Sequence, residues 1–390
     1  MRVLIAFDKF KDALTAPQAC AAAADVLRRQ FPGVMVDECP LADGGEGFGP
    51  ILTAATGGRW VKARVTGPQG EDVEAGFGLV LRSKIPPAAL ARLGLKTEGA
   101  PAGSIIGVVE MAEASGLQLV PRDRRNPWNA TSAGTGELVR AAVAAGANTI
   151  LLGVGGSATH DLGLGALGAL GLILSDVAGK PIAPPFPRDW HRIVRLSGKI
   201  DLPPLYLACD VSNPLLGPRG AAAVYGPQKG LRAEDFDRLE SETGRMAQLL
   251  CGWAGVSASA LAEPGAGAAG GIGFGMRIAL GARLVPGADL IADWLGLRAR
   301  VQSAEVVITG EGRFDRSSAE GKGPGALAAL AAAAGKSVHI FAGQVDLGAS
   351  LRPPGWKLHS ITPADMPLSE ALASAELNLR RAVEEASLLR

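Results

Sequence analysis

The residues of this chain that could carry chemistry gather in short polar segments that directly follow apolar runs. One such segment is Gly153–Asp161, which comes after the run Thr149–Leu152. The run predicts a buried strand, and the segment after it holds glycines, hydroxyls and a carboxylate. Backbone amides that glycines leave uncovered at the end of a strand can bind an anion. The order of residues therefore predicts a nucleotide or phosphate site, although glycines after a strand are as often only a turn.

Acidic residues recur at the ends of the other predicted strands. Carboxylates beside anion-binding glycine loops indicate a hard cation, and Mg²⁺ with nucleotide phosphates is the usual case. Phosphoryl transfer uses a metal ion to neutralise charge, Lys or Arg on the transferring group, and an acid that orients or deprotonates the attacking hydroxyl. Each acid taken alone is equally well explained as a helix cap or turn residue. These acids are Asp8, Asp43, Glu46, Asp161, Asp210, Glu311 and Asp315.

A dinucleotide site is the main alternative. The segment Gly153–Ala158 matches the pattern G-x-G-x-x-A, and Leu172–Asp176 could supply a second strand that ends in an acid for the ribose. This interpretation predicts an NAD(P)-dependent oxidoreductase. Against it, Gly163 and Gly165 fall in the helix that should follow, where each glycine costs about 1 kcal/mol relative to alanine. A second match, Gly265–Gly270, follows no buried strand and is weak.

Several other chemistries are not indicated by the sequence. The phosphate-loop pattern G-x-x-x-x-G-K-[ST] is absent, Ser157 is not in a G-x-S-x-G context, and the four histidines lack metal-binding spacing. The four cysteines show no paired spacing, so neither disulfides nor a zinc site is expected. With a net charge of +1, nucleic acid is not an expected partner. No apolar run is long enough to span a membrane, and we expect a cytoplasmic protein.

The 390 residues exceed what one hydrophobic core usually supports, so two domains are expected. Strand-to-helix units begin at Val3–Phe7 and Val34–Val36, and similar units return after residue 304. Neither end of the chain has enough strands to bury both faces of a sheet. The predicted fold is therefore α/β: residues 1–73 and 284–390 form a Rossmann/flavodoxin-like doubly wound parallel sheet, and residues 74–283 form an inserted α/β domain.

Ligands of such sheets lie beyond the carboxyl ends of the strands. This rule places one set of residues along the edge of the discontinuous sheet, and we expect the active site in the cleft between the two domains. The segment 83–103 is rich in Pro, Gly and Ala and is expected to form a surface insertion. The residues expected along the edge are Asp8, Asp43, Gly310, Asp315 and Gly343.

Short motifs stand in order along nearly the whole chain. They are Asp8-x-Phe10-Lys11, Pro40–Gly47, Glu110–Ala112, Gly134–Glu137, Gly155–Thr159 with Asp161, Ala208–Leu215, Gly217–Ala221, Gly226–Gly230, Gly265–Gly271 and Ile308–Asp315. Together they resemble the glycerate kinase family of the two-domain bacterial type. The resemblance implies ATP-dependent phosphorylation of D-glycerate, usually at the 2-hydroxyl, so that 2-phosphoglycerate is favoured over 3-phosphoglycerate. A sensor that binds a hydroxy acid or nucleotide without chemistry is the non-enzyme alternative.

The resemblance and the strand-end positions together suggest roles in the site. Lys11 and Arg313 are candidates for the substrate carboxylate or the γ-phosphate, Asp43 and Asp315 for Mg²⁺, and either Asp161 or Asp210 for the hydroxyl proton. We expect a monomer or a homodimer. Further residues expected to bind glycerate or ATP are Asp8, Gly44, Gly45, Glu46, Gly155, Gly156, Ser157, Thr159, Gly310, Glu311 and Gly312.

Some positions depart from the family pattern. Lys9 stands where a serine is common, His160 where an asparagine is, and Gln344–Asp346 where a loop with serine is. The 83–103 segment is longer than usual. These departures leave the substrate contacts and the phosphorylated hydroxyl open.

Overall fold

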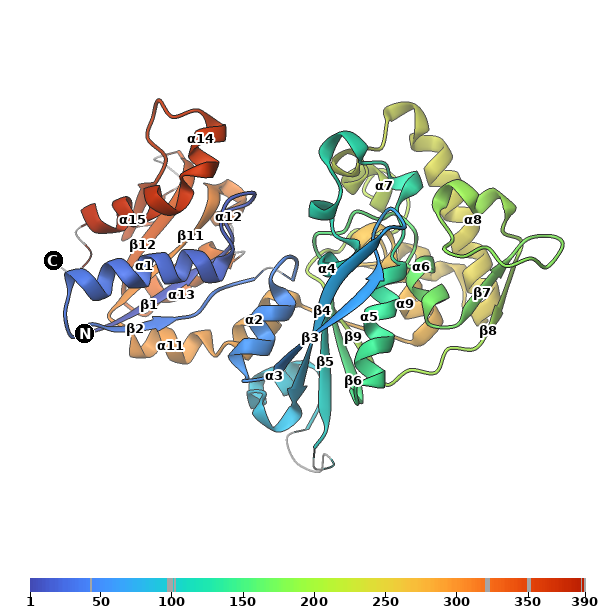
Figure 1. Ribbon diagram of the computed structural model, residues 1–390, viewed down its shortest axis with the longest axis horizontal. Coiled ribbons are helices and arrows are strands. Elements are labelled where there is room, and N and C mark those ends of the chain that lie inside the picture. The colour runs from blue at the N-terminus through green and yellow to red at the C-terminus, as the bar shows by residue number, and fades with distance from the viewer. Residues whose placement is uncertain are drawn as a thin grey trace. The chain divides into compact units, whose positions relative to one another are not determined.

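The computed structural model describes residues 1–42, 44–96, 101, 103–319, 323–348, 352–386 and 388. The chain forms two compact units, each with its own sheet (Figure 1). The first unit contains residues 1–43 and 291–390, and the second contains residues 44–290.

The first unit is a parallel sheet with helices on both faces. Its described strands lie in the order β13-β12-β11-β1-β2, which is 2-1-3-4-5 when they are counted along the chain. That order is the flavodoxin-like form of the doubly wound fold, so the predicted fold class is confirmed. The strands are β1 (Arg2–Phe7), β2 (Met35–Glu38), β11 (Val306–Asp315), β12 (Ser337–Asp346) and β13 (Trp356–Ser360).

Alternation along β1 explains why both faces of this sheet are covered. Val3, Ile5 and Phe7 belong to one apolar cluster with α1 (Ala16–Gln30) and α15 (Ala375–Glu385), and Figure 1 shows these two helices side by side. Leu4 points to the opposite face and is also fully buried, because side chains alternate along a strand. The remaining helices of this unit are α11 (Leu297–Ser303), α12 (Arg316–Ala319), α13 (Gly323–Ala333) and α14 (Leu368–Ala373).

The start of α1 agrees with its sequence signal and the end of the first unit does not. Thr15 with Pro17 in the first turn predicts a helix start, and Thr15 caps α1 through a capping box with Gln18. The apolar spacing from about Leu368 to Leu389 predicts one helix, but the helix is interrupted at Ser374, the residue before α15.

The second unit contains a mixed sheet in the order β10-β9-β6-β5-β4-β3, in which β3 and β4 run antiparallel to their neighbours. Helix α5 packs on one face and helix α2 on the other, because Phe77 joins the cluster of α5 whereas Gly78 abuts Thr53 of α2. The strands are β3 (Arg59–Thr66), β4 (Asp72–Leu81), β5 (Ile105–Glu110), β6 (Thr149–Gly153), β9 (Leu205–Ala208) and β10 (Arg283–Val285).

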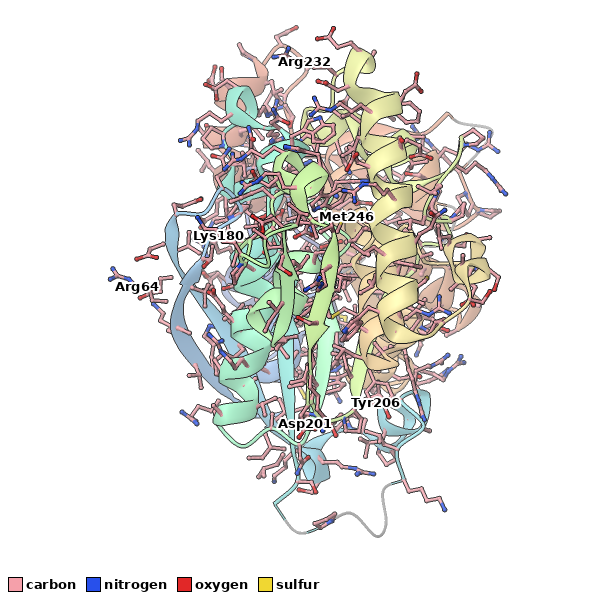
Figure 2. The ribbon with its side chains drawn as sticks, turned by 90° about the vertical axis from the view of Figure 1, so that its right-hand side faces the viewer. Arg64, Lys180, Asp201, Tyr206, Arg232 and Met246 are labelled. Atoms are coloured by element: carbon pink, nitrogen blue, oxygen red, sulfur yellow. The ribbon has the colours of Figure 1, made fainter. Side chains whose placement is uncertain are left out.

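Most helices of the second unit follow the parallel strands. Figure 2 shows the long helix α8 beside the β7–β8 hairpin, with Met246 on α8, Lys180 in the hairpin connection and Arg64 projecting from β3. The elements are α2 (Phe48–Ala55), α3 (Pro87–Arg92), α4 (Met111–Ser115), α5 (Ala133–Ala144), α6 (Leu164–Ala169), β7 (Leu172–Ser175), β8 (Arg195–Gly198), α7 (Ala221–Tyr225), α8 (Phe236–Ala254) and α9 (Ile272–Leu280). The division between the units falls within the next helix, α10 (Gly287–Trp294).

The units divide at other residues than those expected from the sequence. The expected boundaries were 73 and 284, whereas the structure divides the chain after Asp43 and after Leu290. The first difference arises because β3 pairs along its length with β4, which ties residues 44–73 to the second sheet. The second difference arises because β10 pairs with β9, which keeps residues 283–285 in the sheet of the second unit.

The segment 83–103 contains helix α3 and ends before β5, while residues 97–100 and 102 of it lie outside the described part. Among the described residues, no helix is long and apolar enough to cross a membrane.

Candidate active site

The loop after β6 is anchored to neighbouring backbone at several points. The Gly155 amide donates a hydrogen bond to the Gly44 carbonyl (3.0 Å), and the Ala158 amide donates to the Ser115 carbonyl (2.9 Å). A Cβ atom at Gly155 would lie 2.6 Å from the Cα of Gly45. Only a residue without a side chain allows two backbones to approach so closely. The Gly44–Gly45 segment therefore packs directly on this loop, as an assembled site requires.

The dinucleotide interpretation of this loop is not supported by the structure. A ribose-binding acid should follow a strand next to the glycine-bearing strand in the same sheet. Instead β7 pairs with β8 in a separate two-stranded antiparallel sheet, so Asp176 is not placed for that role. The amides of Gly155 and Ala158 also donate hydrogen bonds to protein carbonyls, so they are not available to bind a pyrophosphate.

Glu110 holds the turn that precedes α2. It is buried at the end of β5, and its carboxylate accepts hydrogen bonds from the amides of Gly47 (3.1 Å to each oxygen) and Gly49 (2.9 Å). A carboxylate at the N-terminus of a helix also interacts favourably with the helix dipole. Glu110 belongs to a family motif, but its type and spacing alone did not indicate this role.

Asp161 is a buried anchor rather than an accessible base. Its oxygens accept four hydrogen bonds, from the Ser132 amide and hydroxyl (2.7 Å each), the Gly163 amide (3.1 Å) and the Gly165 amide (3.2 Å). Burial raises the pKa of Asp161, and the hydrogen bonds from Ser132 oppose this change. The carboxylate joins the loop to the start of α5 and to α6, which gives no support to its expected role as proton acceptor.

Of Asp161 and Asp210, the two acids expected to act on the hydroxyl proton, Asp210 is the one exposed to solvent. It follows β9 and is exposed, and both oxygens accept from the Ala288 amide at the start of α10 (3.0 and 3.1 Å). A single backbone donor leaves lone pairs on both oxygens for another partner. Asp210 therefore keeps the capacity to orient a hydroxyl group.

Lys229 is a buried cation that sequence reasoning missed. Its side chain is 2% exposed, and Nζ donates to Ser157 Oγ (2.9 Å) and to the Thr159 carbonyl (2.6 Å). Burial lowers the pKa of Lys229 to about 7, and nearby Asp161 acts in the opposite direction. Its motif, Gly226–Gly230, was a signal that could have identified it, because a lysine between two turn glycines is unusual inside a core.

His160 belongs to the same loop and is buried. Its Nε2 is 3.0 Å from Thr243 Oγ1, whose own hydrogen is donated to the Leu239 carbonyl (2.6 Å). Nε2 must therefore carry the proton, and Nδ1 is an acceptor that has no partner among the described residues. Burial, with Lys229 nearby, lowers the pKa of His160 to about 3, so the ring is neutral at working pH.

In the first unit, the expected binding residues meet at the point where the strand order reverses. Strand β1 pairs with β11 up to Phe7 and Gly310, and the Asp8 amide donates to the Gly310 carbonyl (2.9 Å). A Cβ at Gly312 would lie 3.1 Å from the Lys11 amide. Asp8 and Lys11 therefore lie against Gly310–Gly312, and the Lys11 side chain is exposed. Ligands of doubly wound sheets bind at such a reversal.

The sequence predicts a strand over Glu305–Ile308 and a loop over Thr309–Ser318, but β11 continues beyond Ile308. It pairs with β12 as far as Asp315 and Asp346, so most of the expected loop is strand. At Gly310, φ is +153°, and a Cβ there would overlap the Phe341 carbonyl oxygen. Glycine at this position is what allows the strand to bend and continue.

Arg313 and Asp315 are held by neighbouring groups. Arg313 is exposed and forms ion pairs with Asp346 and, at 3.8 Å, with Asp315. Asp315 Oδ1 accepts from the Ser317 hydroxyl (2.7 Å) and amide (2.9 Å), and these bonds lower its pKa. It therefore stays ionised and fixes the first turn of α12.

Most of the other expected residues lie in described segments, and one does not. Glu46, Thr159 and Glu311 lie in the segments discussed above. Thr159 Oγ1 is buried without a hydrogen-bond partner among the described residues. Asp43, expected to bind metal, lies outside the described part of the chain. Within that part, no three His, Cys, Asp or Glu side chains are grouped so that they could hold a metal ion.

Two α/β units with polar strand-end loops are typical of enzymes that bind phosphorylated ligands, and comparison with known proteins defines the class as phosphotransferases. A family model described as the glycerate kinase family matches residues 3–389. The chain belongs to the glycerate kinase family, as its motifs indicated.

Individual relatives cover almost the whole chain. A glycerate kinase of Bacillus subtilis (strain 168) is 38% identical and covers 99% of this chain and 96% of its own length. A glycerate 2-kinase of Escherichia coli (strain K12) is 35% identical, with coverage of 98% and 96%. A crystal structure from Salmonella typhimurium LT2, provisionally named glycerate kinase 2, has 36% identity, a TM-score of 0.75, and coverage of 98% of this chain and 96% of that chain.

Proposed function

We propose that this protein transfers the γ-phosphoryl group of ATP to the 2-hydroxyl of D-glycerate. The observation that carries the proposal is the family match over residues 3–389. The relative from Escherichia coli named glycerate 2-kinase, 35% identical, supports the 2-hydroxyl as the acceptor. An NAD(P)-dependent oxidoreductase is disfavoured because β7 lies outside the main sheet.

The first unit contributes cationic and anion-binding groups. Lys11 is exposed beside Gly310–Gly312 at the strand-order reversal, and it is proposed to bind a phosphate or the glycerate carboxylate. Arg313 is proposed for the same class of anion, which would compete with Asp346 for its guanidinium. A guanidinium that exchanges one carboxylate for another loses little charge compensation.

Asp210 is proposed as the residue that orients or accepts the hydroxyl proton. Of the two acids expected for this role, it is the exposed one with a single protein donor. Asp161 has its oxygens occupied by Ser132, Gly163 and Gly165. We therefore assign Asp161 to holding the loop and Asp210 to the substrate.

Mg²⁺ is proposed as the companion of ATP, and it would neutralise charge on the transferring phosphate. Magnesium in kinases is held by one or two carboxylates together with substrate phosphates, so a full set of protein ligands is not needed. Asp315 fits this requirement because it stays ionised and its Oδ2 contacts only Arg313, at 3.8 Å, among the described residues. Asp315 is accordingly the proposed metal-binding acid.

The reaction is tested by following ADP formation by the full chain with ATP, Mg²⁺ and D-glycerate. Phosphorus NMR of the product distinguishes 2-phosphoglycerate from 3-phosphoglycerate. Turnover that yields the 2-phosphate supports the proposal, and the 3-phosphate would correct the acceptor hydroxyl. Absence of ADP formation with D-glycerate, or reduction of NAD⁺ in its place, would reject the kinase assignment.

The role of Asp210 is tested by Asp210→Asn, with Asp201→Asn as the matched control. Asp201 is an exposed acid of the same unit, labelled in Figure 2. Loss of a group that orients or accepts the proton should lower kcat by about 10²- to 10⁴-fold, whereas the control should match the wild type. A kcat within threefold of wild type for Asp210→Asn would remove Asp210 from the mechanism.

A further inference from the structure

Lys229 reaches the interior from a tightly confined turn. It ends the 3₁₀ turn Pro227–Lys229, and Gly230 follows with φ of +84°. A Cβ at Gly230 would overlap the Arg125 carbonyl, so the turn is packed closely against the segment before Asn126. The backbone on the C-terminal side of Lys229 therefore has little freedom, and its side chain runs inward at 2% exposure.

The ammonium group has only neutral partners among the described residues. Nζ donates to Ser157 Oγ and to the Thr159 carbonyl, both on the loop after β6. Buried cations are usually paired with a carboxylate, and the nearby Asp161 has its oxygens bound to Ser132, Gly163 and Gly165. The positive charge beneath the loop is therefore only partly compensated by the protein.

The contact with Lys229 fixes the direction of the Ser157 hydroxyl. In its protonated form Lys229 can only donate, so below its pKa of about 7 the Ser157 Oγ accepts at 2.9 Å and its own hydrogen points elsewhere. That hydrogen has no acceptor in the described chain, and neither does the Gly156 amide, whereas the Ser157 amide closes a turn that starts at Val154. The Glu46 carboxylate lies close to the loop, with one oxygen 3.9 Å from the Cβ position of Gly156. The loop thus presents unused donors next to a buried lysine.

A second cation lies on the same side of the loop. A narrow crevice is lined by Lys229, Arg125 and Ala158, among other residues. Arg125 is half-buried and donates to the carbonyls of Val120 (3.3 Å) and Leu117 (3.4 Å). No described carboxylate forms an ion pair with it. The crevice itself is too narrow for a ligand, but two cations beside one loop favour an anion on that loop.

We propose that Lys229 is a positioning residue that presents the Ser157 hydroxyl as a hydrogen-bond donor to an oxyanion of the reactants. The oxyanion is either the carboxylate of the hydroxy acid or a phosphoryl oxygen of the nucleotide. The identity of these reactants rests on the proposed function. Lys229 acts through Ser157 and Thr159 and does not itself need to touch the reactants.

The test compares Ser157→Ala, Lys229→Met, the double variant and Lys180→Met in the full chain. Lys180 is an exposed lysine of the same unit and serves as the control (Figure 2). Loss of a hydrogen bond to a charged group should lower kcat/KM by about 10- to 100-fold in Ser157→Ala. Because Lys229 acts through Ser157, the double variant should be no worse than the more impaired single variant.

Separate titrations of the two substrates distinguish the sources of the oxyanion. A higher KM for D-glycerate with an unchanged KM for ATP identifies the carboxylate. A higher KM for ATP or a lower kcat identifies the phosphoryl group, and either result supports the proposal. Lys229→Arg, which keeps the donor, should recover part of the activity lost in Lys229→Met. A kcat/KM within twofold of wild type for Ser157→Ala, whatever the folding of the Lys229 variants, would overturn the proposal.

Calorimetric titration keeps this inference separate from the proposed function. If the wild type binds D-glycerate or ATP but makes no ADP, the proposed function fails while the inference is still tested. Weaker binding of either compound by Ser157→Ala then supports the oxyanion site. Equal binding by the two proteins, or no binding by the wild type, contradicts it.

Discussion

Replacing Lys229 by methionine should stabilise the protein at neutral pH while it impairs the site. Methionine has nearly the same length but carries no charge, so it can fill the space of the lysine side chain. Burial lowers the pKa of Lys229 from 10.5 to about 7. The folded protein therefore holds the neutral amine more readily than the unfolded chain does, and the ammonium form is buried at a cost.

The sign and size of the effect follow from proton linkage. Between pH 7 and pH 10.5 the unfolded chain keeps a proton that the folded chain releases, so the unfolding free energy rises with pH in this window. The slope is about 1.4 kcal/mol per pH unit, which gives on the order of 3 kcal/mol between pH 7 and pH 9. Below pH 7 both states are protonated and the full cost remains. Methionine removes this cost, which is on the order of 5 kcal/mol for a shift from 10.5 to about 7. It also leaves the Ser157 hydroxyl and the Thr159 carbonyl without their donor, which costs about 1–3 kcal/mol, so we expect a net gain of about 2–4 kcal/mol at pH 6.

Urea titrations of wild type, Lys229→Met and Lys180→Met at pH 6, 7, 8 and 9 measure the effect. The charged or titratable groups near Lys229 are His160 and Asp161 on the loop and Arg125 across the crevice. All three remain in each variant, so the difference between proteins isolates the lysine. Lys229→Met should be more stable at pH 6, with a margin that shrinks toward pH 9, and Lys180→Met should follow the wild type. A Lys229→Met protein less stable than wild type at pH 6 would refute the reasoning.

Three further changes test other parts of the structure. Asp161→Asn should lower the unfolding free energy by about 2–4 kcal/mol in urea titrations, because an amide offers one acceptor oxygen to four donors. Gly310→Ala should destabilise by about 3 kcal/mol in thermal melts, because its Cβ overlaps a carbonyl of β12; an unchanged melting temperature would contradict that geometry. Burial lowers the pKa of His339 to about 3 and also lowers that of His359, to which it is hydrogen-bonded (3.1 Å). The unfolded chain binds more protons below pH 6.5, so the melting temperature should fall as pH drops from 6.5 toward 3, and less so in His339→Leu/His359→Leu.

Much of the fold could be predicted because its strands are strong local signals. The run Val3–Phe7 is apolar throughout and ends in charge, and the structure has β1 at Arg2–Phe7. Pairing partners are less visible in sequence. Nothing local shows that Arg59–Thr66 pairs with β4, which moved the unit boundary from 73 to 43, or that β11 continues past Gly310 by packing on β12.

The candidate site was predictable to the level of segments but not of roles. Glycine spacing indicated the loop after β6, where close backbone packing needs glycine, and its binding of a nucleotide or phosphate stays a prediction. The hydrogen bonds that separate Asp161 from Asp210 come from Ser132 and Ala288, each far away in sequence. Lys229 was missed for the same reason: a lysine is normally read as a surface residue, and its partners lie about seventy residues earlier in the chain.

The arrangement of the first sheet has a consequence for how the protein is made. Strand β1, which is synthesised before the other described strands, lies between β2 and β11, and β11 begins only at Val306. The N-terminal segment must therefore wait for the whole second unit to be synthesised before its central pairing can form. The second unit is continuous from residue 44 to 290, and domains generally fold as units during synthesis. Translation arrested before β11 should accordingly yield a nascent chain whose residues 44–290 resist protease while Arg2–Glu38 is still cut.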